Sequence, residues 1–327
     1  MKRKFGRYGR EVGALGLGCF AIGGPFKGKN GRYLAYGTVS DDESRKIIHK
    51  AIELGINAFD TADVYGCGHS ERILGSVLSE YDRSDFVIAT KFANQFDEQT
   101  KTVIQKNVDP EYIRNALDSS CERLQTDFID VYQLHSSDHD IDDAKTLIPL
   151  LEDLVSEGRI GGYGWSTDDP ERARVFAEGK NCIAMQYAIH VQRLNPKMTD
   201  LCEQHNLAGL IRSPLGSGTL TGKYTKDLKL PEDHMWHGAS FWTEEERFIK
   251  RQAILENLKE FLMDDGRTMV QALLAYLWTT GDTTIPIPGA KTVAQIEENA
   301  GTLEYGPLQS ELLKEINDLF EEIRILV

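Results

Sequence analysis

Short runs of apolar, β-branched and aromatic residues alternate with amphipathic stretches along the chain, and this alternation restricts the folds that the chain can adopt. Most of the runs are almost continuously apolar, which is typical of parallel strands covered on both faces. The first run has the weakest strand character. The runs occupy residues 12–18, 57–62, 86–92, 128–135, 160–167, 182–187, 208–215 and 283–289.

The intervening stretches carry helix start and stop signals. Ser40 precedes three acidic residues and Gly55 closes the same stretch, as expected for an N-terminal cap and a C-terminal stop. The same pattern predicts helices within residues 40–55, 108–124, 142–159, 168–179, 196–206, 243–264, 267–280 and 308–325.

Eight strand–helix units in 327 residues predict a (β/α)8 barrel of the TIM type, an α/β fold. No linker or low-complexity tract divides the chain, so we expect one domain over residues 1–327. A doubly wound open sheet, which is built from the same units, is the alternative.

The composition narrows the classes of partner. A net charge of −14 repels nucleic-acid backbones and anionic membranes, so neither partner is expected. No apolar run is long enough to cross a bilayer, and the basic N-terminus lacks the apolar segment of a secretory signal. Five scattered cysteines suit reduced thiols, and we expect a cytoplasmic protein. Nothing in the sequence indicates the oligomeric state.

Polar residues recur where the predicted strands end, which is where barrels of this type place their active sites. Asp60 and Tyr65 follow the second strand, Lys91 ends the third and His135 ends the fourth. Ser166, Gln186, Ser213 and the turn at 286–291 take the corresponding places in later units.

The first four of these residues make a plausible proton donor. A phenol has a reference pKa of about 10, and a nearby ammonium such as Lys91 stabilises the phenolate. Asp60 can pair with Lys91, and His135 can hydrogen-bond a substrate oxygen. Each residue alone also fits a structural role, such as a cap, a solvated charge or a packing ring. Together they predict a proton donor aimed at a carbonyl oxygen, which becomes an alkoxide as a hydride arrives at the carbonyl carbon.

Seven segments resemble the aldo-keto reductase family, in order and across nearly the whole chain, most closely its bacterial and potassium-channel-β-subunit-like branches. They read FDTADVYGCGHSERILG, IATK, DVYQLH, GYGWST, MQY, SPLGSGTLTGKY and PIPGAKTVAQIEENAG. The resemblance implies an NADPH-dependent barrel enzyme that reduces an aldehyde, ketone or sugar-derived carbonyl to the alcohol. It makes Tyr65 the general acid, assisted by Lys91 and His135, with Asp60 holding Lys91.

The resemblance also implies a cofactor site. Three positions depart from the family pattern: Thr167 replaces a common asparagine, Arg212 a stacking aromatic, and Gln295 the arginine that grips the 2′-phosphate. NADP(H) is therefore expected and NAD(H) is not excluded. The implied cofactor-binding residues are Phe20, Asp60, Ser166, Gln186, Arg212, Ser213, Pro214, Leu215, Ser217, Lys223, Gly289, Lys291, Gln295, Glu298 and Asn299.

Aromatic residues in two loops, 20–33 and 231–242, predict the wall of a pocket for a small carbonyl substrate. Phe26 and Trp236 are the substrate-binding candidates, with Phe241 and Trp242 nearby. Two other functions stay open. One is a regulatory subunit that binds the cofactor with little turnover. The other is a metal-dependent barrel hydrolase, although we predict no metal site because no His-x-His ends the first strand.

Overall fold

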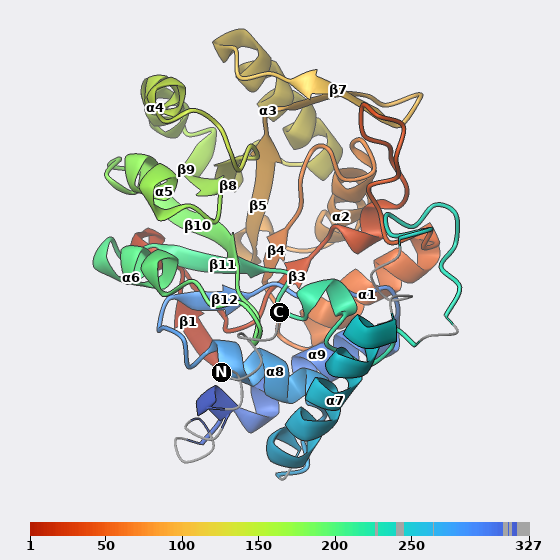
Figure 1. The fold of residues 1–327 in the computed structure, drawn as a ribbon. Helices are drawn as coiled ribbons and strands as arrows, with labels where there is room; N and C mark the ends of the chain where they lie inside the picture. Colours follow the sequence, from red (N-terminus) through yellow and green to blue (C-terminus); the bar gives the residue numbers. More distant parts are fainter. Residues whose placement is uncertain (226–227, 240–244, 264, 310–312, 314–315, 319–327) are drawn as a thin grey trace.

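In the computed structural model a ring of strands lies at the centre of the molecule and helices surround it (Figure 1). The structure describes residues 1–327 except 226–227, 240–244, 264, 310–312, 314–315 and 319–327. In the described part, no helix is both long and apolar enough to span a membrane.

The central sheet has eight parallel strands. In spatial order they are β3 (Leu17–Gly18), β4 (Ala58–Asp60), β5 (Val87–Phe92), β8 (Ile129–Leu134), β9 (Ile160–Ser166), β10 (Cys182–Ala188), β11 (Ala208–Arg212) and β12 (Thr284–Pro286). The first and last strands also meet, because Gly18 bridges Gly289 and the Gly18 amide lies 3.0 Å from the Pro288 carbonyl. The sheet therefore closes, and the predicted (β/α)8 barrel is confirmed.

Closure depends on a glycine in β3. A Cβ atom at Gly18 would lie 2.6 Å from the carbonyl oxygen of Ile287, a contact that side chains do not make. Only a residue without a side chain lets the two edge strands approach at this point.

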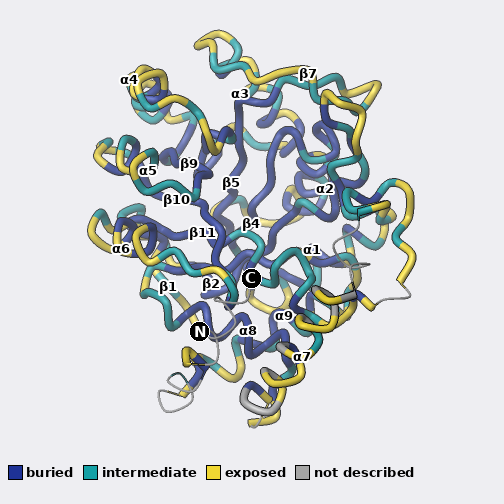
Figure 2. The backbone as a smooth tube through the Cα atoms, viewed as in Figure 1, coloured by how far each residue is buried: buried dark blue, intermediate teal, exposed yellow. Residues whose placement is uncertain are grey.

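Helices cover the outside of the barrel, and their exposed faces contrast with the buried strands in Figure 2. The Ser40 hydroxyl caps the first helix by accepting a hydrogen bond from the Glu43 amide, as predicted. The helices are α1 (Asp41–Glu53), α2 (His69–Leu78), α3 (Pro110–Leu124), α4 (Ile141–Ser156), α5 (Pro170–Ala177), α6 (Pro196–Gln204), α7 (Glu245–Leu262), α8 (Met269–Leu277) and α9 (Val293–Tyr305). Most of the predicted helix 308–325 lies outside the described residues.

One predicted strand was wrong in extent. Residues 12–18 divide between β2 (Glu11–Gly13), which pairs antiparallel with β1 (Lys2–Lys4), and β3, which alone joins the barrel. The apolar run covers both because each is buried. A second hairpin, β6 (Asn94–Asp97) and β7 (Thr102–Lys106), extends the loop after β5 and was not predicted.

Alternate residues of each strand face the barrel interior, and this determines which side chains meet inside it. Ala58, Val87, Ala89, Val131 and Ala184 pack in one buried cluster, apart from the cluster between strands and helices. Because strand side chains alternate with a period of two, the next positions along these strands point to the same side. Those positions are Asp60, Lys91, Gln133 and Gln186.

A buried carboxylate joins several segments near the start of β8. Asp130 accepts hydrogen bonds from Arg10 Nη1 at 2.8 Å and Arg83 Nη2 at 2.6 Å. It also accepts from the Ile88 amide at 2.9 Å and from the Tyr8 hydroxyl at 3.0 Å. Four donors from two parts of the chain, residues 8–10 and 83–88, therefore compensate one fully buried charge.

We predict that Asp130→Ala lowers the free energy of unfolding by about 3–5 kcal/mol, because it leaves two arginines without a counter-charge and a buried amide without an acceptor. Denaturant titration measures the change. The exposed Asp127, three residues earlier, serves as the control, since Asp127→Ala should change stability by less than about 0.5 kcal/mol. Equal losses for the two variants would contradict this role of Asp130.

Candidate active site

Four of the predicted residues come together at the carboxyl ends of β4, β5 and β8. Lys91 Nζ lies 2.9 Å from Asp60 Oδ2, 3.2 Å from the Tyr65 hydroxyl and 2.6 Å from the Thr61 carbonyl. The His135 ring packs edge-on against the Tyr65 ring, with centroids 5.8 Å apart. The structure thus gives Tyr65 an ammonium on one side and an imidazole on the other.

A tight turn after β4 brings Tyr65 to this place. The Tyr65 amide donates to the Ala62 carbonyl at 3.1 Å, and Gly66 follows with a φ of 60°. A Cβ atom at Gly66 would lie 1.8 Å from the Gly23 carbonyl oxygen, so the turn can pack against that segment only with glycine here. Phe20 of the same segment packs edge-on against Tyr65 at 5.0 Å.

Burial and charge act in opposite directions on the tyrosine. Burial raises the pKa of Tyr65, and the Lys91 ammonium partly offsets this increase. Burial alone would lower the pKa of Lys91, but Asp60 and Tyr65 outweigh it and raise that pKa. Lys91 is therefore charged and Tyr65 protonated at neutral pH. That is the state required of a proton donor.

His135 is held neutral. Burial lowers its pKa well below the usual value, and the charges of Lys91, Lys106 and Arg212 lower it further. Its Nδ1 atom is buried and has no hydrogen-bond partner among the described residues. A neutral imidazole in this place can donate an N–H to a substrate oxygen without adding positive charge.

This depressed pKa makes the stability of the protein pH-dependent. Below pH 6.5 the unfolded chain takes up a proton that folded His135 refuses, so stability is lost as the pH falls. His135 therefore adds a slope to the dependence of stability on pH, with stability highest above the usual pKa of a histidine. We predict that His135→Gln removes this slope in denaturant titrations, with His237→Gln at an exposed position as the matched control. An unchanged slope in His135→Gln would refute the assignment.

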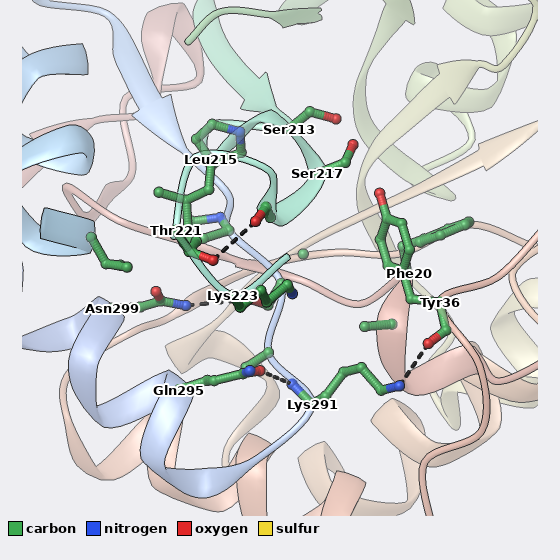
Figure 3. A pocket seen from close by; sticks show the side chains of 18 of the residues that line it. Phe20, Tyr36, Ser213, Leu215, Ser217, Thr221, Lys223, Lys291, Gln295 and Asn299 are labelled. Carbon is green, nitrogen blue, oxygen red and sulfur yellow. Dashed lines mark hydrogen bonds between the residues drawn. The ribbon is translucent and has the colours of Figure 1, made fainter. Parts of the chain in front are cut away.

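A cavity of about 720 Å³ opens beside these residues and extends toward α9. Gly18, Phe20, Asp60, Tyr65, Gln186 and Arg212 line the end near the tyrosine. At the other end, side chains from the β11 loop and from α9 point toward one another across the space (Figure 3). The cavity also contacts Ser213, Pro214, Leu215, Ser217, Lys223, Gly289, Lys291, Gln295, Glu298 and Asn299, which are predicted cofactor residues.

The far end of the cavity suits an anion. Burial lowers the pKa of both Lys223 and Lys291, and the charge of Lys291 lowers that of Lys223 further. No ion pair joins either lysine to an acid in the described part of the chain; Lys291 Nζ instead donates to the Tyr36 carbonyl at 2.6 Å. Ser213 and Ser217 have φ values of 52° and 58°, a conformation that turns successive amides into anion-binding nests.

The three departures from the family pattern have clear structural partners. Thr167 is fully buried and donates to the Ser137 carbonyl at 2.8 Å. Arg212 Nη2 donates to Asp168 at 2.5 Å, which ties the ends of β9 and β11. Gln295 accepts from the Lys291 amide at 2.8 Å. Each group already has a partner within the protein.

Two predicted substrate residues and one cofactor residue lie behind the cavity wall. Phe26 is buried and packs edge-on against Phe20 at 6.2 Å, so it supports that ring from behind. Trp236 packs against Tyr36 at 5.9 Å. Ser166 reaches the cavity only through Gln186, whose Oε1 it approaches at 3.5 Å. Phe241 and Trp242 lie outside the described residues.

Sequence reasoning missed two polar groups at the site. Gln133 is fully buried and its Nε2 lies 3.3 Å from Asp60 Oδ1, while Asp168 anchors Arg212. The alternation of β8 contained the signal for Gln133, because it shares the inward side with Val131. For metal binding, the described residues contain no cluster of three His, Cys, Asp or Glu side chains.

The chain resembles known proteins over nearly all of its length. Residues 14–321 match the model of the aldo/keto reductase family. An NADP(+) aldo-keto reductase of Schizosaccharomyces pombe is 28% identical over 96% of this chain and 90% of its own. The glycerol dehydrogenase AKR11B4 of Gluconobacter oxydans superposes with a TM-score of 0.80 and is 26% identical over 96% of this chain and 93% of its own. An NADH-specific methylglyoxal reductase of Escherichia coli is 27% identical over 94% of this chain and 95% of its own.

The chain belongs to the aldo/keto reductase family. It is an NAD(P)H-dependent oxidoreductase with a (β/α)8 barrel, as the match over nearly its whole length and the closed sheet show.

Proposed function

We propose that the protein reduces an aldehyde, ketone or sugar-derived carbonyl to the alcohol with NADPH, and that Tyr65 delivers the proton. The proposal rests on two contacts inside the barrel: Lys91 Nζ donates to Asp60 Oδ2 and to the Tyr65 hydroxyl. A charged lysine beside a buried phenol stabilises the phenolate that remains after proton transfer.

The reaction divides between cofactor and protein. A nicotinamide bound in the cavity would supply the hydride. Tyr65, which lines the cavity, gives its proton to the carbonyl oxygen, and neutral His135, packed against the Tyr65 ring, donates a hydrogen bond to that oxygen. Phe20 forms an apolar wall beside the Tyr65 ring.

The cavity supports binding of the cofactor along its length. Gln186, which lines the cavity, is the proposed partner of the carboxamide, and Ser166 behind it donates to Gln186 Oε1 at 3.5 Å. Ser213, Leu215 and Ser217 line the proposed pyrophosphate site. Lys223 and Lys291 form no ion pair with an acid among the described residues, and the two positive charges support a phosphate near them. The proposed partners of the adenosine part of the cofactor are Glu298 and Asn299 of α9, which line the cavity.

A regulatory subunit with little turnover is the second candidate. The intact contacts among Asp60, Lys91 and Tyr65 favour the enzyme, since a binding subunit has no need of a charged lysine buried beside a phenol. Oxidation of NADPH in the presence of an aldehyde panel separates the two functions: tight NADPH binding without oxidation favours the regulatory subunit.

We predict that Tyr65→Phe lowers kcat for carbonyl reduction by about 10²- to 10⁴-fold, because only the proton donor is lost. The dissociation constant of NADPH, measured by fluorescence titration, should stay within about twofold. Tyr112→Phe, in α3 and away from the cavity, is the control for removal of a hydroxyl. Turnover by Tyr65→Phe at the wild-type rate would overturn the proposal.

We predict that Lys291→Ala weakens NADPH binding by about 10- to 100-fold and NADH binding far less, because only NADPH carries the 2′-phosphate. Titrations of both cofactors measure the two constants. Lys197→Ala on the exposed face of α6 controls for the loss of a positive charge. Equal losses for the two cofactors would exclude this role for Lys291.

A further inference from the structure

The side-chain amide of Gln133 lies against Asp60 from inside the barrel. Gln133 of β8 is fully buried, does not line the cavity, and places its Nε2 atom 3.3 Å from Asp60 Oδ1. Its Oε1 atom has no hydrogen-bond partner among the described residues. A buried amide with one unsatisfied end is less stable than an apolar side chain of the same size. Its presence therefore calls for a functional reason.

The same oxygen of Asp60 has another donor that the cavity can reach. Gln186 Nε2 lies 2.6 Å from Asp60 Oδ1, and Gln186 lines the cavity. Ser166 approaches the other end of this amide at 3.5 Å. Asp60 Oδ1 thus has one donor open to a bound molecule and one enclosed by the protein.

We propose that Gln133 is a positioning residue that holds Asp60 Oδ1 when a bound nicotinamide carboxamide engages Gln186. This inference rests on the proposed function, because it requires the cofactor to use Gln186. Gln133 then keeps Asp60 oriented toward Lys91 in the complex that carries out the reaction.

The distances around Lys91 indicate that its contact with Tyr65 depends on the orientation of Asp60. Its contact to the Tyr65 hydroxyl is 3.2 Å, whereas those to Asp60 and to the Thr61 carbonyl are 2.9 and 2.6 Å. A carboxylate left without donors on Oδ1 draws the ammonium toward both of its oxygens. The longest contact, to Tyr65, is then lost first, and the pKa of Tyr65 rises because its phenolate loses the adjacent charge.

Gln133→Met tests the proposal, because it removes the donor and keeps the length of the side chain. We expect kcat to fall about 10-fold. The upper limb of the pH profile of kcat should move upward by about half a pH unit or more. The dissociation constant of NADPH should stay within about twofold, and thermal stability should not fall. Leu134→Met, the adjacent residue on the helix-facing side of β8, controls for altered packing.

Two outcomes overturn the proposal. An unchanged pH profile in Gln133→Met would do so, and so would losses of activity and stability that match those of Leu134→Met.

Titration of the Tyr65 phenolate by ultraviolet absorbance, with Tyr65→Phe as the blank, gives a readout without turnover. With NADP⁺ bound, the pKa of Tyr65 should rise in Gln133→Met relative to wild type. If wild type binds cofactor but reduces no carbonyl, the proposed function fails, and this titration alone still decides the role of Gln133.

Discussion

The ion pair between Lys91 and Asp60 is the interaction on which the site depends. The Lys91 side chain is fully buried, and Asp60 is only 4% exposed, so neither charge is solvated by water. Removing two charges from water is costly unless each finds good partners, and a hydrophobic pair of the same volume is often as stable. Stability alone therefore does not account for the pair. The barrel provides the hydrogen-bond partners that a buried ion pair needs.

Those partners come from the geometry of the strands. β4, β5, β8 and β10 each contribute one inward side chain at their carboxyl ends, so Asp60, Lys91, Gln133 and Gln186 meet without any loop having to place them. Tyr65 is the exception, and its turn is fixed instead by the contact of Gly66 with Gly23. The side chains that surround Lys91 thus come largely from the strands, whereas the walls of the cavity come largely from loops.

The sequence predicts more of the fold than of the contacts. Strand and helix periods, with the cap at Ser40, are local properties, and they were enough to predict the barrel. The division of residues 12–18 was not predictable in the same way, because pairing of β2 with β1 depends on a partner elsewhere in the chain. The four catalytic candidates followed from their places at strand ends. The alternation of β8 places Gln133 on the inward side, but its contact with Asp60 and the link from Arg212 to Asp168 needed the register between strands, which one sequence does not contain.

The contacts of Lys91 also limit the chemistry of the site. An ammonium has three N–H groups, and here Asp60, the Thr61 carbonyl and the Tyr65 hydroxyl take one each. With its coordination complete, the nitrogen has neither a hydrogen to offer a substrate nor a lone pair with which to attack one. Lys91 is thereby barred from forming a Schiff base with a carbonyl compound. Any aldehyde that entered this barrel would not be trapped by the lysine.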